Sequence, residues 1–477
     1  MAVNFETVIG LEIHSELATK TKIFCNCTTE FGGEQNTHCC PVCTGMPGVL
    51  PVLNNTVVEF AVKAGLAMNC KIANFSKFDR KNYFYPDLPK AYQTSQYDLP
   101  ICIGGYITLD NGKKIGITRI HIEEDAGKLI HDKVAKRTYV DYNRCGVPLI
   151  EIVSEPDMRN ADEVREFVEK VRAILLYSGV SDCRMEEGSL RADVNLSVRP
   201  FGQEKFGTRT EMKNINSIRA IVRAVEGETI RQIDVIKAGG KIDQQTRRWD
   251  DNKGTSKALR GKEEANDYRY FPEPDLVPIK LEDSTINEIK ASLPEMPDAR
   301  LKKYIADGIA KADAQIIVVS KAISDFFEEV STLCGNSKEA AKWVVGEMMR
   351  QLKDKEIEPE NIPFPASYLS DIITMCSTNK ITAAAAKKVF SMLFECNDTP
   401  AQLVEKYSLA TIGDDSTVDA AIEKVISQNP KSIEDYSNGK DKAFSFLMGQ
   451  AMKELKGKAD PGIIREKLTT KLLECRM

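Results

Sequence analysis

Residues 8–17 read VIGLEIHSEL, an apolar run that Glu12, His14 and Glu16 interrupt at alternate positions. Alternate side chains of a β-strand point to the same face of its sheet, so these three residues are expected to share one face. A carboxylate such as Glu12 is costly to bury unless a cation or hydrogen bonds compensate it. The stretch therefore predicts a strand that presents polar, metal-type ligands on one face.

Other short runs that are typical of strands continue along residues 1–293. They are YITL (106–109), KIGITRIHI (114–122), VPLIEIV (147–153) and DVNLSVRP (193–200). A helix is predicted among them at 162–178, with Asn160 and Glu163 as a capping box and Gly179 as its stop. Strands and a few helices without regular βαβ alternation predict an α+β domain on a mainly antiparallel sheet.

The chain turns helical after residue 293. Helical periodicity runs through 293–308, 322–335, 338–354 and 382–395. A break in NDTPAQLV divides this half into an all-helical domain at 294–405 and an all-helical tail at 406–477. Within the tail, Gly457 and Pro461 predict an interruption between two helices.

Five cysteines lie close together between Cys25 and Cys43. Cys25-x-Cys27 and Cys40-x-x-Cys43 have the short spacing of a tetrahedral zinc site, which would be structural because four thiolates leave no open position. Cys39 and His38 are spare ligands, so the ligand set stays ambiguous. Surface or redox cysteines are the alternative interpretation.

Acidic and histidine residues recur in the predicted strands. They are Glu12, His14, Glu123, Glu124, Asp125, Glu151, Glu155, Glu186, Glu187, Asp193 and Glu211. Each of these residues taken singly is more simply a solvated charge or an ion-pair partner. Together, hard oxygen ligands with one imidazole favour a Mg²⁺ or Mn²⁺ site.

Basic and aromatic residues interleave in KFDRKNYFYPDLPKAYQTSQYD, residues 77–98. This pattern suits phosphate contacts with base stacking, and it suits equally a loop that packs its tyrosines on the core. The net charge of −5 argues against nucleic-acid binding through bulk positive charge, though not against a local basic surface.

Several common motifs do not occur in the sequence. There is no G-x-x-x-x-G-K-[ST] loop, no G-x-G-x-x-G before a helix and no G-x-S-x-G elbow. If the protein uses ATP, metal-bridged carboxylates and scattered Arg and Lys residues must hold it. We see no signal peptide or membrane-spanning segment and expect a soluble, cytoplasmic protein with no membrane partner.

Long blocks of the sequence resemble, in order, the B subunits of bacterial tRNA-dependent amidotransferases. The blocks include VIGLEIHSEL, KFDRKNYFYPDLPKAYQTSQYD, IHIEEDAGKL, GVPLIEIVSEPDMR, MEEGSLRADVNLSVRP, FGTRTEMKNINSIRAI and DYRYFPEPDLVPI. The resemblance implies a glutamine-synthetase-like cradle domain at 1–293, a helical domain and a YqeY-like tail.

The resemblance also implies a reaction and partners. The cradle would phosphorylate the side-chain carboxylate of Glu-tRNA(Gln) or Asp-tRNA(Asn) with ATP. Ammonia from the amidase partner, which is the A subunit of such enzymes, would then complete the amide. The small C subunit would complete a heterotrimer, and the tRNA(Gln) or tRNA(Asn) would contact the helical parts.

Site residues follow from the resemblance. The implied Mg²⁺ ligands are His14, Glu124 and Glu151, with Glu12, Asp193 and Glu211 completing the site. Lys81 would line the ammonia channel, and Cys25, Cys27, Cys40 and Cys43 match the zinc-bearing members of the family. Arg191 and Lys213 are expected to contact the nucleotide for a different reason, which is that they lie beside Asp193 and Glu211 in the sequence.

Three other interpretations remain open from the sequence. One is a carboxylate–amine ligase that acts on a small molecule without tRNA. Another is a non-catalytic scaffold that binds zinc and RNA. The third is the archaeal-type E subunit, for whose inserted synthetase-like domain the chain is too short.

Overall fold

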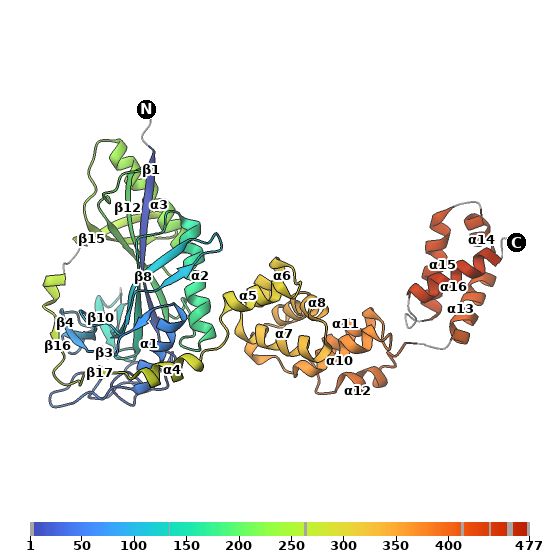
Figure 1. The fold of residues 1–477 in the computed structure, drawn as a ribbon, viewed down its shortest axis with the longest axis horizontal. Helices are drawn as coiled ribbons and strands as arrows, with labels where there is room; N and C mark the ends of the chain where they lie inside the picture. The colour runs from blue at the N-terminus through green and yellow to red at the C-terminus, as the bar shows by residue number, and fades with distance from the viewer. Residues whose placement is uncertain are drawn as a thin grey trace. The chain divides into compact units, whose positions relative to one another are not determined.

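The computed structural model describes residues 4–132, 134–261, 265–411, 415–437, 440–455 and 461–474. The chain divides into two compact units, residues 1–297 and 298–477 (Figure 1). Strands dominate the first unit and helices the second, so the predicted α+β fold is confirmed.

A ten-stranded sheet forms the centre of the first unit, in the order β15-β14-β13-β12-β1-β11-β8-β6-β2, with β7 paired to β8. Neighbouring strands are antiparallel except β13 and β14. The strands are β1 (Phe5–Glu16), β2 (Lys71–Ile72), β6 (Cys102–Ile103), β7 (Tyr106–Thr108), β8 (Lys114–Glu124), β11 (Pro148–Ser154), β12 (Leu190–Pro200), β13 (Thr210–Lys213), β14 (Gln245–Asp250) and β15 (Thr255–Gly261). The stretch VIGLEIHSEL thus lies almost wholly in β1, a central strand that is paired on both sides.

One face of this sheet is apolar. Leu11, Ile13, Ile120, Ile152 and Val194 are buried on it, and they belong to one hydrophobic cluster with residues of three helices. The helices are α1 (Asn55–Ala67), α2 (Ala161–Tyr177) and α3 (Ile218–Lys237). Because side chains alternate along each strand, the residues between these apolar positions lie on the opposite face.

The predicted helix at 162–178 is α2. The Asn160 side chain accepts a hydrogen bond from the Glu163 backbone N–H (2.9 Å), as a capping box requires. The Glu163 carboxylate accepts instead from the Arg159 N–H and from Lys113, so half of the box is present. Gly179 follows the helix with a φ of 68°, a backbone conformation that glycine adopts without strain.

Smaller elements surround the sheet. They are β3 (Phe75–Ser76), β4 (Asp79–Asn82), β5 (Tyr92–Ser95), β9 (Lys128–Asp132), β10 (Arg137–Asp141), the short helix at Ala265–Tyr268, β16 (Phe271–Pro272), β17 (Ile279–Lys280) and α4 (Asp283–Ala291). The basic and aromatic segment forms β4 and β5, which pair with each other, and β4 also pairs with β16. The segment is therefore held in a three-stranded sheet.

The second unit contains two separate hydrophobic clusters. The first is built by α5 (Pro297–Ala306), α6 (Lys311–Ile317), α7 (Lys321–Cys334), α8 (Ser337–Lys342), a π-helical stretch (Trp343–Met348), α9 (Met349–Asp354), a short turn (Pro359–Asn361), α10 (Ala366–Ser377), α11 (Ala383–Met392) and α12 (Pro400–Lys406). The chain stays with this cluster to Thr411, whose N–H donates to the Lys380 carbonyl (2.8 Å).

The second cluster lies nearer the C-terminus. It is formed by α13 (Asp415–Gln428), α14 (Pro430–Ser437), α15 (Asp441–Glu454) and α16 (Pro461–Glu474). The predicted interruption between the last two helices is confirmed at its Pro461 end, while Gly457 lies outside the described residues. Across the described ranges, no helix combines the length and apolar character that crossing a membrane requires.

Candidate functional site

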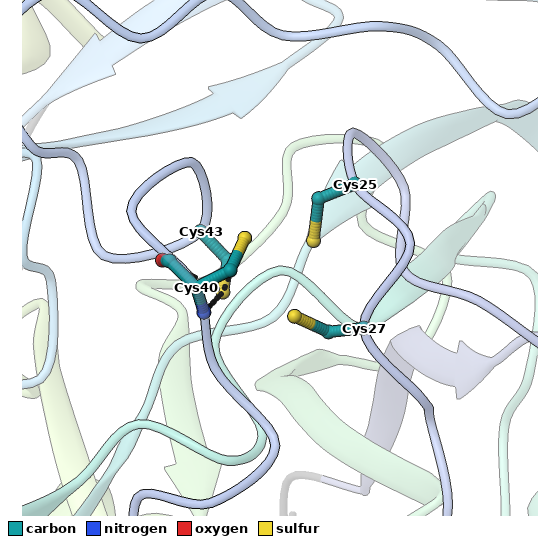
Figure 2. A group of neighbouring side chains, drawn as sticks. All are labelled: Cys25, Cys27, Cys40 and Cys43. Carbon is teal, nitrogen blue, oxygen red and sulfur yellow. Dashed lines mark hydrogen bonds between the residues drawn. The ribbon is translucent and has the colours of Figure 1, made fainter.

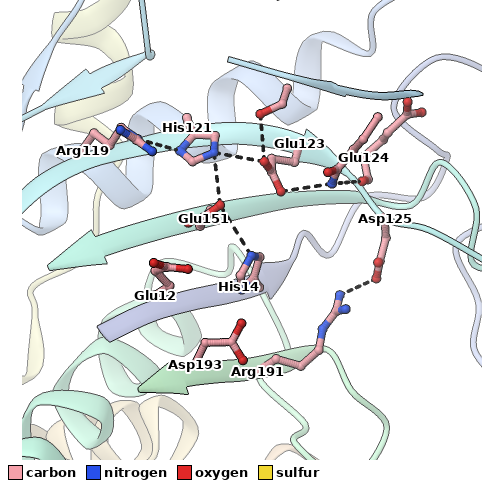
Figure 3. A network of polar contacts seen from close by, with 12 residues as sticks. Glu12, His14, Arg119, His121, Glu123, Glu124, Asp125, Glu151, Arg191 and Asp193 are labelled. Carbon is pink, nitrogen blue, oxygen red and sulfur yellow. Dashed lines mark hydrogen bonds and ion pairs between the residues drawn. The ribbon is translucent and has the colours of Figure 1, made fainter. Parts of the chain in front are cut away.

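The polar face of the sheet gathers charged residues from several strands (Figure 3). On β1, His14 stands opposite Glu151 of β11 and opposite Arg191 of β12. Glu151 in turn stands opposite His121 of β8. Residues opposite each other in antiparallel strands share a face, so the pairing register alone brings these side chains together.

His14, Glu123 and Glu151 form the first group that could hold a metal ion, with ligand atoms within 4.8 Å of one another. The His14 Nε2 atom lies 3.5 Å from a Glu151 oxygen. His121 Nε2 lies 3.3 Å from the same oxygen and 3.1 Å from a Glu123 oxygen. Two carboxylates with an imidazole suit a hard divalent cation.

Hydrogen bonds orient Glu123 within this group. Ser95 Oγ donates to one carboxylate oxygen (2.8 Å) and Gln93 Nε2 donates to the other (3.1 Å). Both donors lie on β5, so the basic and aromatic segment supports the polar face directly. These two hydrogen bonds hold both carboxylate oxygens of Glu123 in place.

The charges of the group compensate one another. Burial alone would raise the pKa of Glu123, but Lys81 and His121 lower it to about 2. Burial opposes protonation of His121, yet Glu151 and Glu123 raise its pKa to about 9. The pKa of Glu151 falls well below its ordinary value despite burial, chiefly because of His121 and His14. Both carboxylates are therefore ionised at neutral pH, as metal ligands must be.

Glu124 does not join this group. Glu123 and Glu124 are neighbours in β8, so their side chains leave the strand on opposite sides. The Glu124 carboxylate accepts a hydrogen bond from the Thr94 N–H (2.8 Å) and pairs with the Lys90 ammonium. The expected place of Glu124 beside His14 is corrected by the structure, which puts Glu123 there.

A second group of acids lies along the same face. Glu12, Asp193 and Glu211 bring their oxygens within 4.8 Å of one another. Lys213 pairs with Asp193 and lies 3.1 Å from a Glu211 oxygen. Burial lowers the pKa of Lys213, but Asp193 and Glu211 outweigh that effect and raise it. The Lys213 ammonium thus lies among these carboxylates, in the place that a metal cation would take.

Arg191 belongs to a third set of contacts at the end of β1. Its guanidinium pairs with Asp125 and lies 3.8 Å from Glu16. Burial and the neighbouring Asp125 carboxylate raise the pKa of Glu16 to about 8. Arg191 is thus held between two acids beside the first metal-type group.

Lys81 stands close to that group from the side of β4. Burial would lower its pKa, but Glu123, together with neighbouring groups that include Glu151, raises it. Its ammonium also lies 5.1 Å from the centre of the Tyr268 ring and 5.9 Å from that of Tyr83, in cation–π contacts. Lys81 therefore forms a cationic, aromatic wall beside the carboxylates.

The four predicted cysteines meet in one place (Figure 2). The sulfurs of Cys25, Cys27, Cys40 and Cys43 lie within 4.8 Å of one another. A tetrahedral zinc–thiolate complex with bonds of about 2.3 Å separates its sulfurs by about 3.8 Å. The set therefore fits a zinc ion.

The spare ligands turn elsewhere. Cys39 Sγ contacts the Asn36 carbonyl (3.3 Å), and His38 Nδ1 lies 3.2 Å from the Glu30 carbonyl. Neither residue belongs to the group of four cysteines.

The sequence interpretation missed the roles of Glu123, His121 and Asp125. His121 and Glu123 alternate along β8 as Glu12 and His14 do along β1, so the period of two could have identified Glu123. The pairing of Asp125 with Arg191 depends on strand register and leaves no local signal.

Comparison with known proteins accounts for both units. Residues 7–287 match the GatB/GatE catalytic domain, and residues 325–472 match a GatB domain. These matches define the class of protein, a catalytic subunit of a ligase-type amidotransferase. The chain belongs to the GatB/GatE family.

Relatives extend this similarity over nearly the whole chain. A protein of Caldicellulosiruptor bescii is 58% identical over 98% of this chain and 99% of its own length. One from Caldicellulosiruptor saccharolyticus is 57% identical, with the same coverage. One from Ruminiclostridium cellulolyticum is 55% identical over 98% of this chain and 97% of its own length. All three are named as the B subunit of aspartyl/glutamyl-tRNA(Asn/Gln) amidotransferase.

Proposed function

We propose that this chain uses ATP to activate the side-chain carboxylate of Glu-tRNA(Gln) or Asp-tRNA(Asn) for amidation. The names of the relatives support the tRNA substrates. The observation that carries the chemistry is the convergence of His14, Glu123 and Glu151 on one small volume of the polar face. A free carboxylate is a poor electrophile, and its phosphorylation supplies a leaving group.

His14, Glu123 and Glu151 would hold Mg²⁺ or Mn²⁺, with Glu12, Asp193 and Glu211 available for a second ion. A divalent cation there supplies charge stabilisation for the transferring phosphoryl group. Lys213 would exchange its carboxylate partners for phosphate oxygens when the nucleotide binds. Arg191, held by Asp125 and Glu16, is positioned to bind a phosphate or the substrate carboxylate.

Ammonia must attack the activated carboxylate before water does. Lys81 and the tyrosines beside it form a cationic, aromatic wall that we assign to the end of an ammonia path. A cationic wall disfavours ammonium and admits neutral ammonia, because like charges repel. The ammonia would come from the amidase (A) partner, and the small (C) partner would complete the heterotrimer.

Cys25, Cys27, Cys40 and Cys43 would hold a structural zinc ion that keeps residues 25–43 folded against the sheet. Cys25 and Cys43 line a cavity of about 150 Å³ that Glu124 and Lys90 also line. The zinc-bearing segment therefore shapes the space on the far side of β8 from the first metal group.

The test is a reconstituted reaction. The chain is co-expressed with its amidase and small partners, and the purified complex is supplied with glutamine, ATP and each misacylated tRNA in turn. The proposal predicts conversion to Gln-tRNA(Gln) or Asn-tRNA(Asn), with ATP hydrolysis that depends on the misacylated tRNA. ATP turnover with free glutamate and no tRNA would support the small-molecule ligase instead.

A further inference from the structure

Lys22 is a lysine whose side chain is fully buried, with 0% of its surface exposed. Its ammonium contacts Cys43 Sγ at 3.7 Å and the Tyr142 carbonyl oxygen at 3.5 Å. Within the ranges that the structure describes, no carboxylate oxygen lies within 4.0 Å of this ammonium. A buried ammonium is costly without a compensating negative charge, so its counter-charge must come from another kind of group.

The neighbouring cysteines can supply that charge. Four thiolates around one zinc ion carry two more negative charges than the ion neutralises. The Cys43 sulfur accepts a hydrogen bond from the Cys40 N–H (3.1 Å), so it is already placed as an acceptor. A cation beside the same sulfur offsets part of the excess charge.

We infer that Lys22 is a positioning residue of the metal centre, an inference that rests on the zinc ion assigned under the proposed function. Its ammonium balances the charge of the metal–thiolate complex through the sulfur of Cys43, the buried member of the four cysteines. It also ties that complex to the Tyr142 carbonyl. Groups outside the metal ligands commonly set affinity and orientation in this way.

Hydrogen bonds of residues next to Lys22 lead toward the polar face of the sheet. The Cys145 thiol donates to the Cys43 carbonyl (3.1 Å), and the Ile23 N–H donates to the Gly146 carbonyl (3.0 Å). The Gly146 N–H donates in turn to the Asp125 carbonyl (2.9 Å). The side-chain carboxylate of Asp125 pairs with Arg191. The metal centre and residues 142–147 therefore hold the chain just past β8.

The test measures zinc retention on the full-length chain. Lys22→Met keeps the length and burial of the side chain but removes its charge. Competition with a chromogenic chelator should show zinc held about 10- to 100-fold more weakly than in the wild type. The absorption of the Co²⁺-substituted protein should report the altered thiolate site. Lys20→Met, at a nearby exposed lysine, is the matched control and should retain zinc as the wild type does.

A second readout separates charge balance from simple packing. Removing zinc from the wild type leaves Lys22 without its counter-charge, so the chelator should lower the unfolding temperature more in the wild type than in Lys22→Met. If Lys22 only packs against residues 142–147, the chelator should lower both unfolding temperatures equally. Lys22→Gln is the second variant, since it keeps a donor for the Tyr142 carbonyl but carries no charge.

The outcomes distinguish this inference from the function on which it rests. A wild-type chain that binds neither Zn²⁺ nor Co²⁺ overturns the metal centre itself. A wild type that binds zinc tightly, with Lys22→Gln or Lys22→Met binding it equally tightly, overturns the role of Lys22 alone. Weaker retention in both neutral variants, with Lys20→Met unchanged, supports the inference.

Discussion

His14 and Glu151 stand directly opposite each other in β1 and β11, with His14 Nε2 3.5 Å from a Glu151 oxygen. The antiparallel register of the two strands produces this contact, and the next pairing, with β8, adds His121. The sheet therefore builds its polar site by stacking one row of side chains across adjacent strands.

Glu123 and Glu124 should have separable roles in metal binding. Glu123→Gln removes a charged oxygen from the first group and should abolish Mn²⁺ binding there, whereas Glu124→Gln should leave it intact because Glu124 pairs with Lys90. The transamidation rate of Glu123→Gln should fall by about 10²-fold or more, with tRNA affinity unchanged. Electron paramagnetic resonance of bound Mn²⁺ measures the first effect. Equal Mn²⁺ binding by wild type and Glu123→Gln would refute the assignment.

The second group of acids should hold its own ion. Asp193→Asn should remove one Mn²⁺ per chain in the presence of ATP while the ion at the first group remains, because the two groups share no ligand. Isothermal titration calorimetry would count the ions. Loss of both ions in this variant would show that the two groups form a single coupled site.

Glu228 on α3 should contribute stability that depends on pH. Burial would raise its pKa, but hydrogen bonds from Arg231, Gln232 and Thr210 lower it below the ordinary 4.5. A lowered folded-state pKa means that the contribution is complete above pH 4.5 and is lost as the pH falls through the folded-state value. Glu228→Gln should therefore cost about 2 kcal/mol at pH 7.

Unfolding temperatures measured from pH 7 down to pH 4 check this prediction. The difference between wild type and Glu228→Gln should shrink below pH 4.5. Glu226→Gln, at an exposed position of the same helix, is the control and should behave as the wild type does. A difference that stays constant over the range would contradict the assigned direction.

The cluster of helices α13 to α16 should contribute to tRNA binding and not to ATP binding. Deleting residues 412–477 removes α13 to α16. It keeps the β-bridge between Ile381 and Ala410 and the hydrogen bond from the Thr411 N–H to the Lys380 carbonyl, which hold the end of the preceding helical cluster. The KM for tRNA in the transamidation assay should rise more than the KM for ATP. An unchanged KM for tRNA would argue that the cluster has another task.

The fold could be predicted from the sequence where the signal is local. The runs at 114–122, 147–153 and 193–200 fall in β8, β11 and β12, because alternation and β-branched residues report directly on strands. Periodicity could not show that the helix predicted at 338–354 contains the π-helical stretch Trp343–Met348, since the apolar spacing hardly changes.

The site was predictable to a smaller extent. The two cysteine pairs, His14 and Glu151 lie as expected, because each belongs to a compact motif or to a strand with clear alternation. The choice between Glu123 and Glu124 depended on which of them shares a face of β8 with His121, a comparison that the sequence interpretation did not make. Arg191 and Asp125 meet only after β12, β1, β11 and β8 have paired in register, and no local pattern encodes that.

The most direct test of the account is to locate a divalent cation on the polar face. Crystals of the assembled enzyme soaked in Mn²⁺ and a non-hydrolysable ATP analogue would be measured at the manganese absorption edge. We predict an anomalous peak bound by His14, Glu123 and Glu151. A peak at Glu124, or no peak on this face of the sheet, would contradict the account.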